Sequence, residues 1–206
     1  MNQVNKKLEQ IAELRKIRIH EPFAEFLHAE LSMHSFEISL LDCYRMSGHA
    51  CHAITGAYLV SEAAIERLFS ETKICERGDL AVEFGSNLDE RATGPRSNVI
   101  SFITGAWAST GFPGLKGNFK RKDLLSYGHS ELGQGAIRFR RISTGKAVVV
   151  EYDPSDLLKK LNLNLDFPEK WRAEICAILN NPLEVLKITV EDAQGSCNSL
   201  GSNGCC

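Results

Sequence analysis

Apolar and polar residues follow a helical spacing over the first part of the chain. Residues 2–18 repeat apolar side chains every three or four positions, with charged residues on the other side, which predicts an amphipathic helix (Val4, Leu8, Ile11, Leu14, Ile17). A second helical stretch begins near Pro22. From Phe36 to Met46 the spacing fits a helix or a strand, and we interpret it as a helix.

Residues 50–69 carry the strongest helical pattern. One face repeats small and apolar residues at steps of three and four (Ala53, Ala57, Val60, Ala64, Leu68). Small side chains let a neighbouring element approach closely. Further apolar residues widen this face (Ile54, Tyr58, Ile65, Phe69). The pattern therefore predicts a central helix that is buried on more than one side.

The following segments alternate between strands and helices. Leu80 to Phe84 is a predicted strand, and a helix is predicted from Gly94-Pro95 to Ser109, because proline is tolerated in the first helical turn. The glycine-rich loop 111–117 is a candidate lid or rim for a site. Strands are expected over 119–125, 136–142 and 147–152, and the last two form a hairpin. Helices over 155–161 and 168–179 precede an edge strand within 183–191.

Composition narrows the class of protein. The 206 residues have a net charge of −2, so the chain lacks the basic footprint expected of a nucleic-acid-binding protein. The sequence has neither an apolar run of 18 residues nor an apolar leader, which predicts a cytoplasmic protein without a membrane anchor. Seven unevenly spaced cysteines argue against a disulfide framework (Cys43, Cys51, Cys75, Cys176, Cys197, Cys205, Cys206).

The candidate chemistry lies in the segment Ser47-Gly48-His49-Ala50-Cys51-His52. Imidazole nitrogen and thiolate sulfur are preferred zinc ligands, which makes His49, Cys51 and His52 the candidate metal ligands. Side chains two positions apart on a helix point about 200° away from each other. His49 and Cys51 can therefore share an ion only if the helix begins at or after Cys51. If it begins at Ser47, His49 and His52 are the better pair.

A structural interpretation competes with the metal site. The two histidines can be surface or cap residues, and a cysteine without a disulfide is commonly a small buried apolar residue. Two ligands do not complete a zinc site, so the others must come from elsewhere. Candidates are Asp89, Glu90, His34, Cys43 and a thiol of the tail that begins at Ala193. We expect this tail to be mobile unless its thiols are held.

The order of these segments resembles the FmdE family, which is named after a component of formylmethanofuran dehydrogenase. The resemblance covers residues 35–152 and includes Gly48-His49-Ala50-Cys51, Ile103-Thr104-Gly105 and Thr144-Gly145-Lys146. It implies an α+β fold, with a core of helix, strand, helix and three strands in a mixed sheet. It further implies a homodimer and a metal, typically zinc, near the Gly-His-x-Cys segment.

The sequence departs from that family in several positions. Ser47 stands where a histidine is usual, His52-Ala53 replace Pro-Gly, and Ala106 replaces a cysteine. Thr93 to Asn98 lacks the family's cysteine and aspartate, and a recognisable C-terminal zinc ribbon is missing. The resemblance therefore implies a divergent, stand-alone member whose metal ligands are altered.

A cluster of basic residues adds a second candidate feature: Lys116, Lys120, Arg121, Lys122, Arg138, Arg140 and Arg141. If the strands are neighbours, these residues can hold a small anionic ligand near the glycine-rich loop. Alternating arginines are also typical of the solvated face of a half-buried sheet. Motifs of nucleotide cofactors and serine hydrolases are absent from the sequence.

Two functions of different class follow from these observations. The first is a metal-binding accessory protein, or one that handles a metal or small molecule, with zinc at the Gly48–His52 segment. The second is an enzyme acting on a small anionic substrate through an open metal position or through the thiolate of Cys51. We divide the chain into an N-terminal helical extension (1–34), an FmdE-like domain (35–152), C-terminal helices with an edge strand (153–192) and a cysteine-containing tail (193–206).

Overall fold

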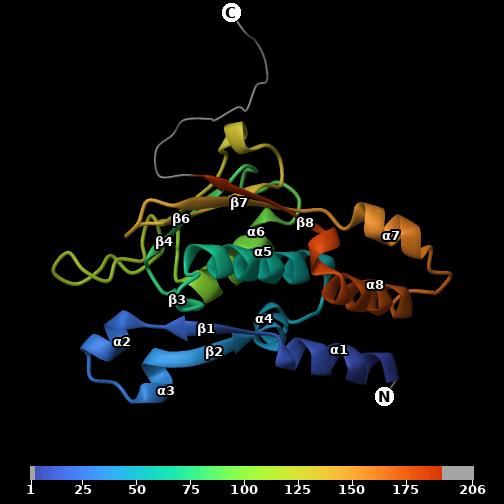
Figure 1. The fold of residues 1–206 in the computed structure, drawn as a ribbon, viewed down its shortest axis with the longest axis horizontal. Coiled ribbons are helices and arrows are strands. Elements are labelled where there is room, and N and C mark those ends of the chain that lie inside the picture. Colours follow the sequence, from blue (N-terminus) through green and yellow to red (C-terminus); the bar gives the residue numbers. More distant parts are fainter. Residues whose placement is uncertain (1–2, 192–206) are drawn as a thin grey trace, which may run out of the picture.

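The computed structural model describes residues 3–191, and within them the strands form two sheets with helices between and beside them (Figure 1). The central helix α5 (His52–Leu68) lies between the sheets, together with α6 (Thr93–Thr104). Twelve residues of α5 are buried, so this helix is surrounded on most sides, as its sequence predicts. The predicted α+β fold is confirmed.

The larger sheet has the strand order β5-β4-β6-β7-β8. Its strands are β4 (Leu80–Phe84), β5 (Leu125–Ser126), β6 (Ile137–Arg141), β7 (Ala147–Tyr152) and β8 (Leu186–Glu191). β4 and β5 run parallel and the other neighbours are antiparallel, which makes the sheet mixed. The predicted hairpin of β6 and β7 and the edge strand β8 are confirmed. The strand predicted over 119–125 is wrong, because only its last residue enters β5.

The smaller sheet contains β1 (Lys16–His20), β2 (Ser35–Ser39) and β3 (Ile74–Glu76) in the order β2-β1-β3. The helix predicted over 2–18 is too long: α1 (Gln3–Leu14) ends before β1. The physical reason is a period of two after Arg15, because Ile17 and Ile19 are buried while their neighbours face outward. The segment 1–34 thus contains a strand and is not helical throughout.

The helix predicted over 36–46 is also partly wrong. β2 occupies its first part, and α4 (Leu40–Ser47) follows. Ser39 and Asp42 form a capping box at this boundary, in which the Ser39 hydroxyl accepts the Asp42 N–H at 3.1 Å. The Ser39 N–H donates to the Asp42 carboxylate at 2.9 Å. The change from strand to helix is therefore specified locally by these two side chains.

The remaining helices surround this core. They are α2 (Pro22–Phe26), α3 (Leu31–His34), α7 (Ser155–Leu161) and α8 (Glu169–Asn180), with short 3₁₀ turns at Ser130–Leu132 and Pro182–Glu184. The predicted helices over 155–161 and 168–179 are confirmed. α6 ends at Thr104 instead of Ser109, because Gly105 adopts a left-handed conformation (φ 72°).

The predicted mobile tail and the predicted lack of a membrane anchor remain to be compared with the structure. Cys197, Cys205 and Cys206 lie outside the described residues. Among the helices of residues 3–191, none has the length and apolar content needed to cross a bilayer.

Candidate metal centre

The segment predicted to bind metal forms the turn between α4 and α5. α4 ends at Ser47, and Gly48 follows in a left-handed conformation (φ 77°). Cys51 is the extended N-cap residue of α5, and the helix begins at His52. Of the two geometries that the sequence allows, the structure therefore adopts the one in which the helix starts after Cys51.

The side chains of this turn have separate surroundings. His49 is exposed, and its Nδ1 donates to the Ser47 carbonyl oxygen at 3.0 Å. Cys51 is 8% exposed and belongs to the hydrophobic core. His52 packs against the Trp171 ring, with 4.6 Å between ring centroids. Its Nε2 lies 3.2 Å from a carboxylate oxygen of Glu174.

These contacts attach the turn to α8. The indole N–H of Trp171 donates to the Ala50 carbonyl at 3.1 Å, and Trp171 and Glu174 both belong to α8. Burial lowers the pKa of His52 below its usual value, although the Glu174 carboxylate acts in the opposite direction. The contacts of His52 therefore fit a neutral side chain in a helix-to-helix contact.

A different group of residues meets the geometric requirement for a metal site. His20, Glu25 and His34 each offer a ligand atom, and these three atoms lie within 4.8 Å of one another. Among the residues that the structure describes, this is the one set of three His, Cys, Asp or Glu side chains with that property. We call these residues the His20–Glu25–His34 triad.

Strand pairing brings the triad together. His20 is the last residue of β1 and pairs with Ser35 of β2, which directly follows His34. The Glu21 N–H donates to the His34 carbonyl at 2.8 Å. Glu21 also caps α2, because its side chain accepts the Phe23 N–H at 3.2 Å, and Glu25 lies on that short helix.

The two ring nitrogens of His20 face two carboxylates. Nε2 lies 3.0 Å from Glu25, and Nδ1 lies 2.6 Å from Glu76 of β3. Burial alone lowers the pKa of His20, but the hydrogen bonds to Glu76 and Glu25 raise it overall. In the absence of a cation, a protonated His20 between two carboxylates is therefore favourable.

His34 adds a buried ring nitrogen to the two carboxylates and the imidazole of His20. Its ring lies edge-on to that of His20, with 6.2 Å between centroids. The Nδ1 atom of His34 is buried and has no hydrogen-bond partner. Buried polar atoms without a partner are uncommon in folded proteins. A protonated His20 satisfies Glu25 and Glu76 but leaves this nitrogen without a partner. In the Gly48–His52 turn, Nε2 of His52 is likewise buried without a hydrogen-bond partner.

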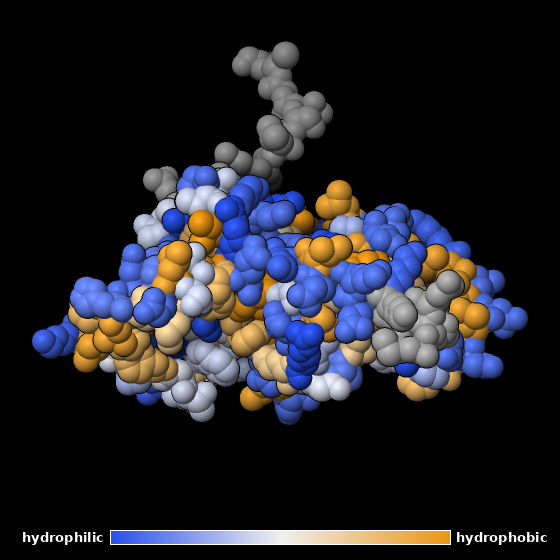
Figure 2. Space-filling view, turned by 90° about the horizontal axis from the view of Figure 1, so that it is seen from below, coloured by the Kyte–Doolittle hydropathy of each residue, from blue (hydrophilic) through white to orange (hydrophobic). Residues whose placement is uncertain are grey.

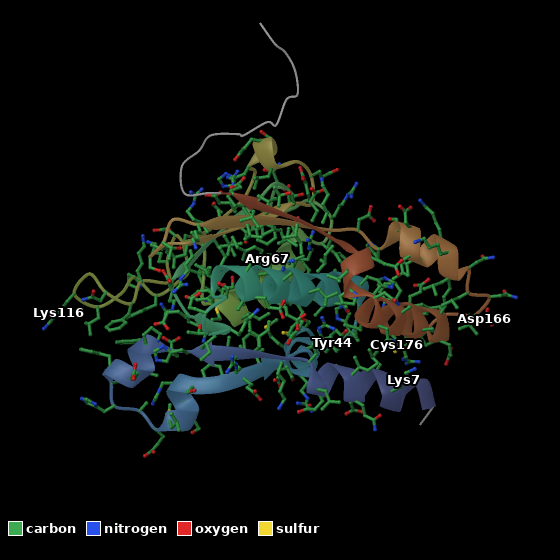
Figure 3. All side chains as sticks on the ribbon, in the orientation of Figure 1. Lys7, Tyr44, Arg67, Lys116, Asp166 and Cys176 are labelled. Atoms are coloured by element: carbon green, nitrogen blue, oxygen red, sulfur yellow. The ribbon has the colours of Figure 1, made fainter. Side chains whose placement is uncertain are left out.

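The glycine-rich loop lies beside α2 and not over the Gly48–His52 turn. Phe112 and Phe119 pack on Phe23, with centroids 5.1 and 5.0 Å away. Lys116 of this loop and Cys176 of α8 lie toward opposite ends of the molecule (Figure 3). In Figure 2, apolar residues gather at the end formed by α2 and this loop. The predicted rim therefore borders the helix that carries Glu25.

The predicted basic cluster is divided by the fold. Arg138 bonds to Glu83 at 2.8 Å and to Glu191 at 2.9 Å, and Arg141 bonds to Asp79 at 3.0 Å. Arg138 lies on the polar face of the larger sheet, as one of the two interpretations expects. Arg141 lies instead over the Phe69 ring at the end of α5, 4.2 Å from its centroid. Arg121 is instead 8% exposed and pairs with Glu21.

Sequence reasoning identifies only one residue of the triad, since His34 is a candidate extra ligand. It misses His20 and Glu25, because the helical spacing of the preceding residues extends the predicted helix over the start of β1. The alternation of Lys16-Ile17-Arg18-Ile19-His20 is the signal that predicts a strand here and places His20 at its end.

Comparison with known proteins gives a distant structural likeness. No protein-family model and no curated protein matches the chain. The chain is similar to the crystal structure of a tungsten formylmethanofuran dehydrogenase FmdE-like protein from Syntrophus aciditrophicus, with a TM-score of 0.44 and 15% sequence identity. The match covers 81% of this chain and 79% of that one. At this level the likeness concerns the course of the chain alone.

Proposed function

We propose that this protein binds a divalent transition-metal ion, with zinc as the first candidate, through His20, Glu25 and His34. The observation that supports this proposal most directly is that His20, Glu25 and His34 each offer a donor atom and that these three atoms lie within 4.8 Å of one another. His34 also has a buried Nδ1 atom without a hydrogen-bond partner.

The donor set suits such an ion. Two imidazoles and one carboxylate are a ligand combination of zinc and of ferrous iron, and three protein ligands leave a coordination position open. Metal-binding histidines commonly donate their second ring N–H to a carboxylate, which fixes the ring and its tautomer. Glu76 has this relation to His20, at 2.6 Å from Nδ1.

An accessory or metal-handling role fits this site best. An ion held by three side chains near the surface can be exchanged more readily than one in a closed four-ligand site. The side chains of His20 and Glu25 are 27% and 59% exposed, which leaves a path for the ion.

A metal-dependent enzyme acting on a small anionic substrate is the second candidate. An open coordination position is what such an enzyme needs, and the Arg121–Glu21 pair adjoins the triad, because Glu21 directly follows His20 in the chain.

A thiol-dependent enzyme has less support, because the predicted nucleophile Cys51 is buried in the core. Burial raises the pKa of the Cys43 and Cys75 thiols to about 12. The predicted homodimer stays a prediction.

Metal titration of the purified chain tests the proposal. Zinc binding is measured by isothermal titration calorimetry after chelator treatment, for the unmodified protein and for His34→Ala. We expect one zinc ion per chain and a loss of affinity of more than about 100-fold in H34A, because one ligand is removed.

His28→Asn is the matched control. His28 lies on the connection between α2 and α3, just before the helix that carries His34. It has a left-handed conformation (φ 56°), which asparagine also adopts. H28N should retain full zinc affinity. Equal zinc binding in H34A and H28N contradicts the proposed site.

Cobalt substitution separates the triad from the Gly48–His52 segment. A thiolate ligand adds an intense sulfur-to-cobalt charge-transfer band in the near ultraviolet, whereas imidazole and carboxylate ligands do not. We expect visible d–d bands without that charge-transfer band. A charge-transfer band that disappears in Cys51→Ala would instead support the ligand set predicted from His49, Cys51 and His52.

A further inference from the structure

An open pocket of about 370 Å³ lies against the glycine-rich loop, lined by Trp107, Thr110, Gly111, Phe112 and Arg121. This volume falls within the range of roughly 300–1,000 Å³ that small-molecule sites occupy. Trp107 is 36% exposed and Phe112 is 40% exposed, so both residues are accessible to a ligand.

Backbone hydrogen bonds fix the wall of the pocket. The Trp107 N–H donates to the Arg121 carbonyl at 3.0 Å, and the Arg121 N–H donates to the Phe112 carbonyl at 2.8 Å. Gly111 packs so closely that a Cβ atom there would lie 2.7 Å from the Arg121 carbonyl group. The loop therefore holds Arg121 and Phe112 in a defined relation, which a binding site requires.

The charge around Arg121 is not balanced. Arg121 and Arg77 both pair with Glu21, and within residues 3–191 no other carboxylate lies in ion-pair distance of either guanidinium. The Nε atom of Arg77 is buried without a hydrogen-bond partner. Two guanidinium groups thus share one carboxylate in a largely buried place. An excess buried charge is costly unless an opposite charge compensates it.

We propose that this pocket binds a small organic acid, whose carboxylate pairs with Arg121 and whose apolar body lies against Trp107 and Phe112. The planar guanidinium matches a carboxylate geometrically, and an aromatic wall suits a flat apolar body. The other side of the Phe112 ring stacks on Phe23 at an interplanar angle of 22°, which keeps the ring in place. Thr110 also lines the pocket.

This proposal does not depend on the metal site. Glu21 nevertheless connects the two, because its side chain pairs with Arg121 while its N–H donates to the His34 carbonyl. An acid in the pocket would therefore lie near the His20–Glu25–His34 triad, as expected of a substrate or of a ligand that accompanies the ion.

Titration with benzoate tests the pocket in metal-free protein with a chelator present, so that the outcome is separate from zinc binding. Ligand-observed NMR follows the unmodified protein, Arg121→Gln, Thr110→Phe and Thr110→Ser. We expect saturable binding in the unmodified protein and in T110S. Binding should weaken by about tenfold or more in R121Q, because a charge-assisted hydrogen bond is lost, and in T110F, because the larger ring fills the pocket.

The control Arg140→Gln removes an arginine of the sheet face and should leave benzoate binding unchanged. T110F alters an exposed position, so it tests the pocket even if R121Q fails to fold. Unchanged benzoate binding in T110F or in a folded R121Q overturns the proposal, as does loss of binding in R140Q. Inorganic phosphate is the second probe, and phosphate binding at least as tight as benzoate binding would overturn the organic-acid assignment.

Discussion

Two regions of this protein carry histidines near acidic side chains, and they differ in how their donors are arranged. The Gly48–His52 turn contains three potential ligands within four positions of sequence. The triad takes its potential ligands from positions 20, 25 and 34 on three different elements. Only the second set has three donor atoms within 4.8 Å of one another among the described residues.

The difference shows that closeness in sequence is a poor guide to which donor atoms meet. In the turn, the helix start places Cys51 in the core and directs His52 toward Trp171 of α8. In the triad, the antiparallel pairing of β1 with β2 brings His20 next to the end of α3. Strand register therefore fixes which of these side chains lie next to each other.

The largest effect should come from removing two potential ligands from each region in turn, with one double variant per region. We expect His20→Ala with His34→Ala to abolish stoichiometric zinc, a loss of more than about 100-fold in affinity. His49→Ala with Cys51→Ala should retain one zinc ion per chain. Elemental analysis after gel filtration measures both, and the opposite result would move the metal site to the turn.

A smaller effect on zinc affinity is expected from Glu76, whose carboxylate bonds to Nδ1 of His20. Glu76→Gln keeps the side-chain shape but weakens the bond that orients the ring. We expect zinc affinity to fall by about 10-fold to 100-fold, measured by competition with a chromophoric chelator. Glu30→Gln, an exposed position just before α3, is the control and should bind zinc normally. A normal affinity in E76Q would argue against a role for Glu76 in orienting a ligand.

A substitution at the Gly48–His52 turn should lower the free energy of unfolding and leave zinc binding unchanged. Trp171→Phe removes the indole N–H that donates to the Ala50 carbonyl. We expect the free energy of unfolding to fall by about 1 kcal/mol, because a hydrogen bond is lost. Chemical denaturation measures the change, and zinc stoichiometry serves as the internal control. If W171F loses zinc at unchanged stability, the turn has a functional role after all.

The smallest effect concerns how the free energy of unfolding depends on acidic pH through Asp42 of α4, the helix that leads into the turn. The pKa of Asp42 is lowered overall, because its bonds with Ser39 and the nearby Arg45 outweigh the effect of burial. A lowered carboxyl pKa in the folded state contributes stability above the ordinary pKa of 3.8, and this is lost as the pH falls through the folded-state value. Asp42→Asn should cost about 0.5 kcal/mol at pH 7.

Denaturation curves of this variant and the unmodified protein should converge as the pH approaches and falls below the folded-state pKa of Asp42. A difference in the free energy of unfolding that stays constant from neutral pH into this acidic range would contradict this origin of the effect.

The sequence by itself determined the elements whose residues follow one period. The spacing in α5 predicts a buried central helix, and the alternation of Ile137 and Phe139 with Arg138 and Arg140 predicts β6 and its polar face. These elements depend on local spacing, so one sequence is enough to identify them. At residues 16–20 and 35–39 the alternation is short and adjoins a helix, so the helical spacing hides it.

Only the tertiary structure decided which polar side chains meet. His20, Glu25 and His34 come together because β1 pairs with β2, and Arg77 and Arg121, which are far apart in the sequence, both reach Glu21. Such contacts depend on strand register and on how loops fold back, and neither leaves a periodic mark in the sequence. The turn at Gly48 to His52 shows the reverse case: its donors are adjacent in sequence, and packing against the core and α8 separates them.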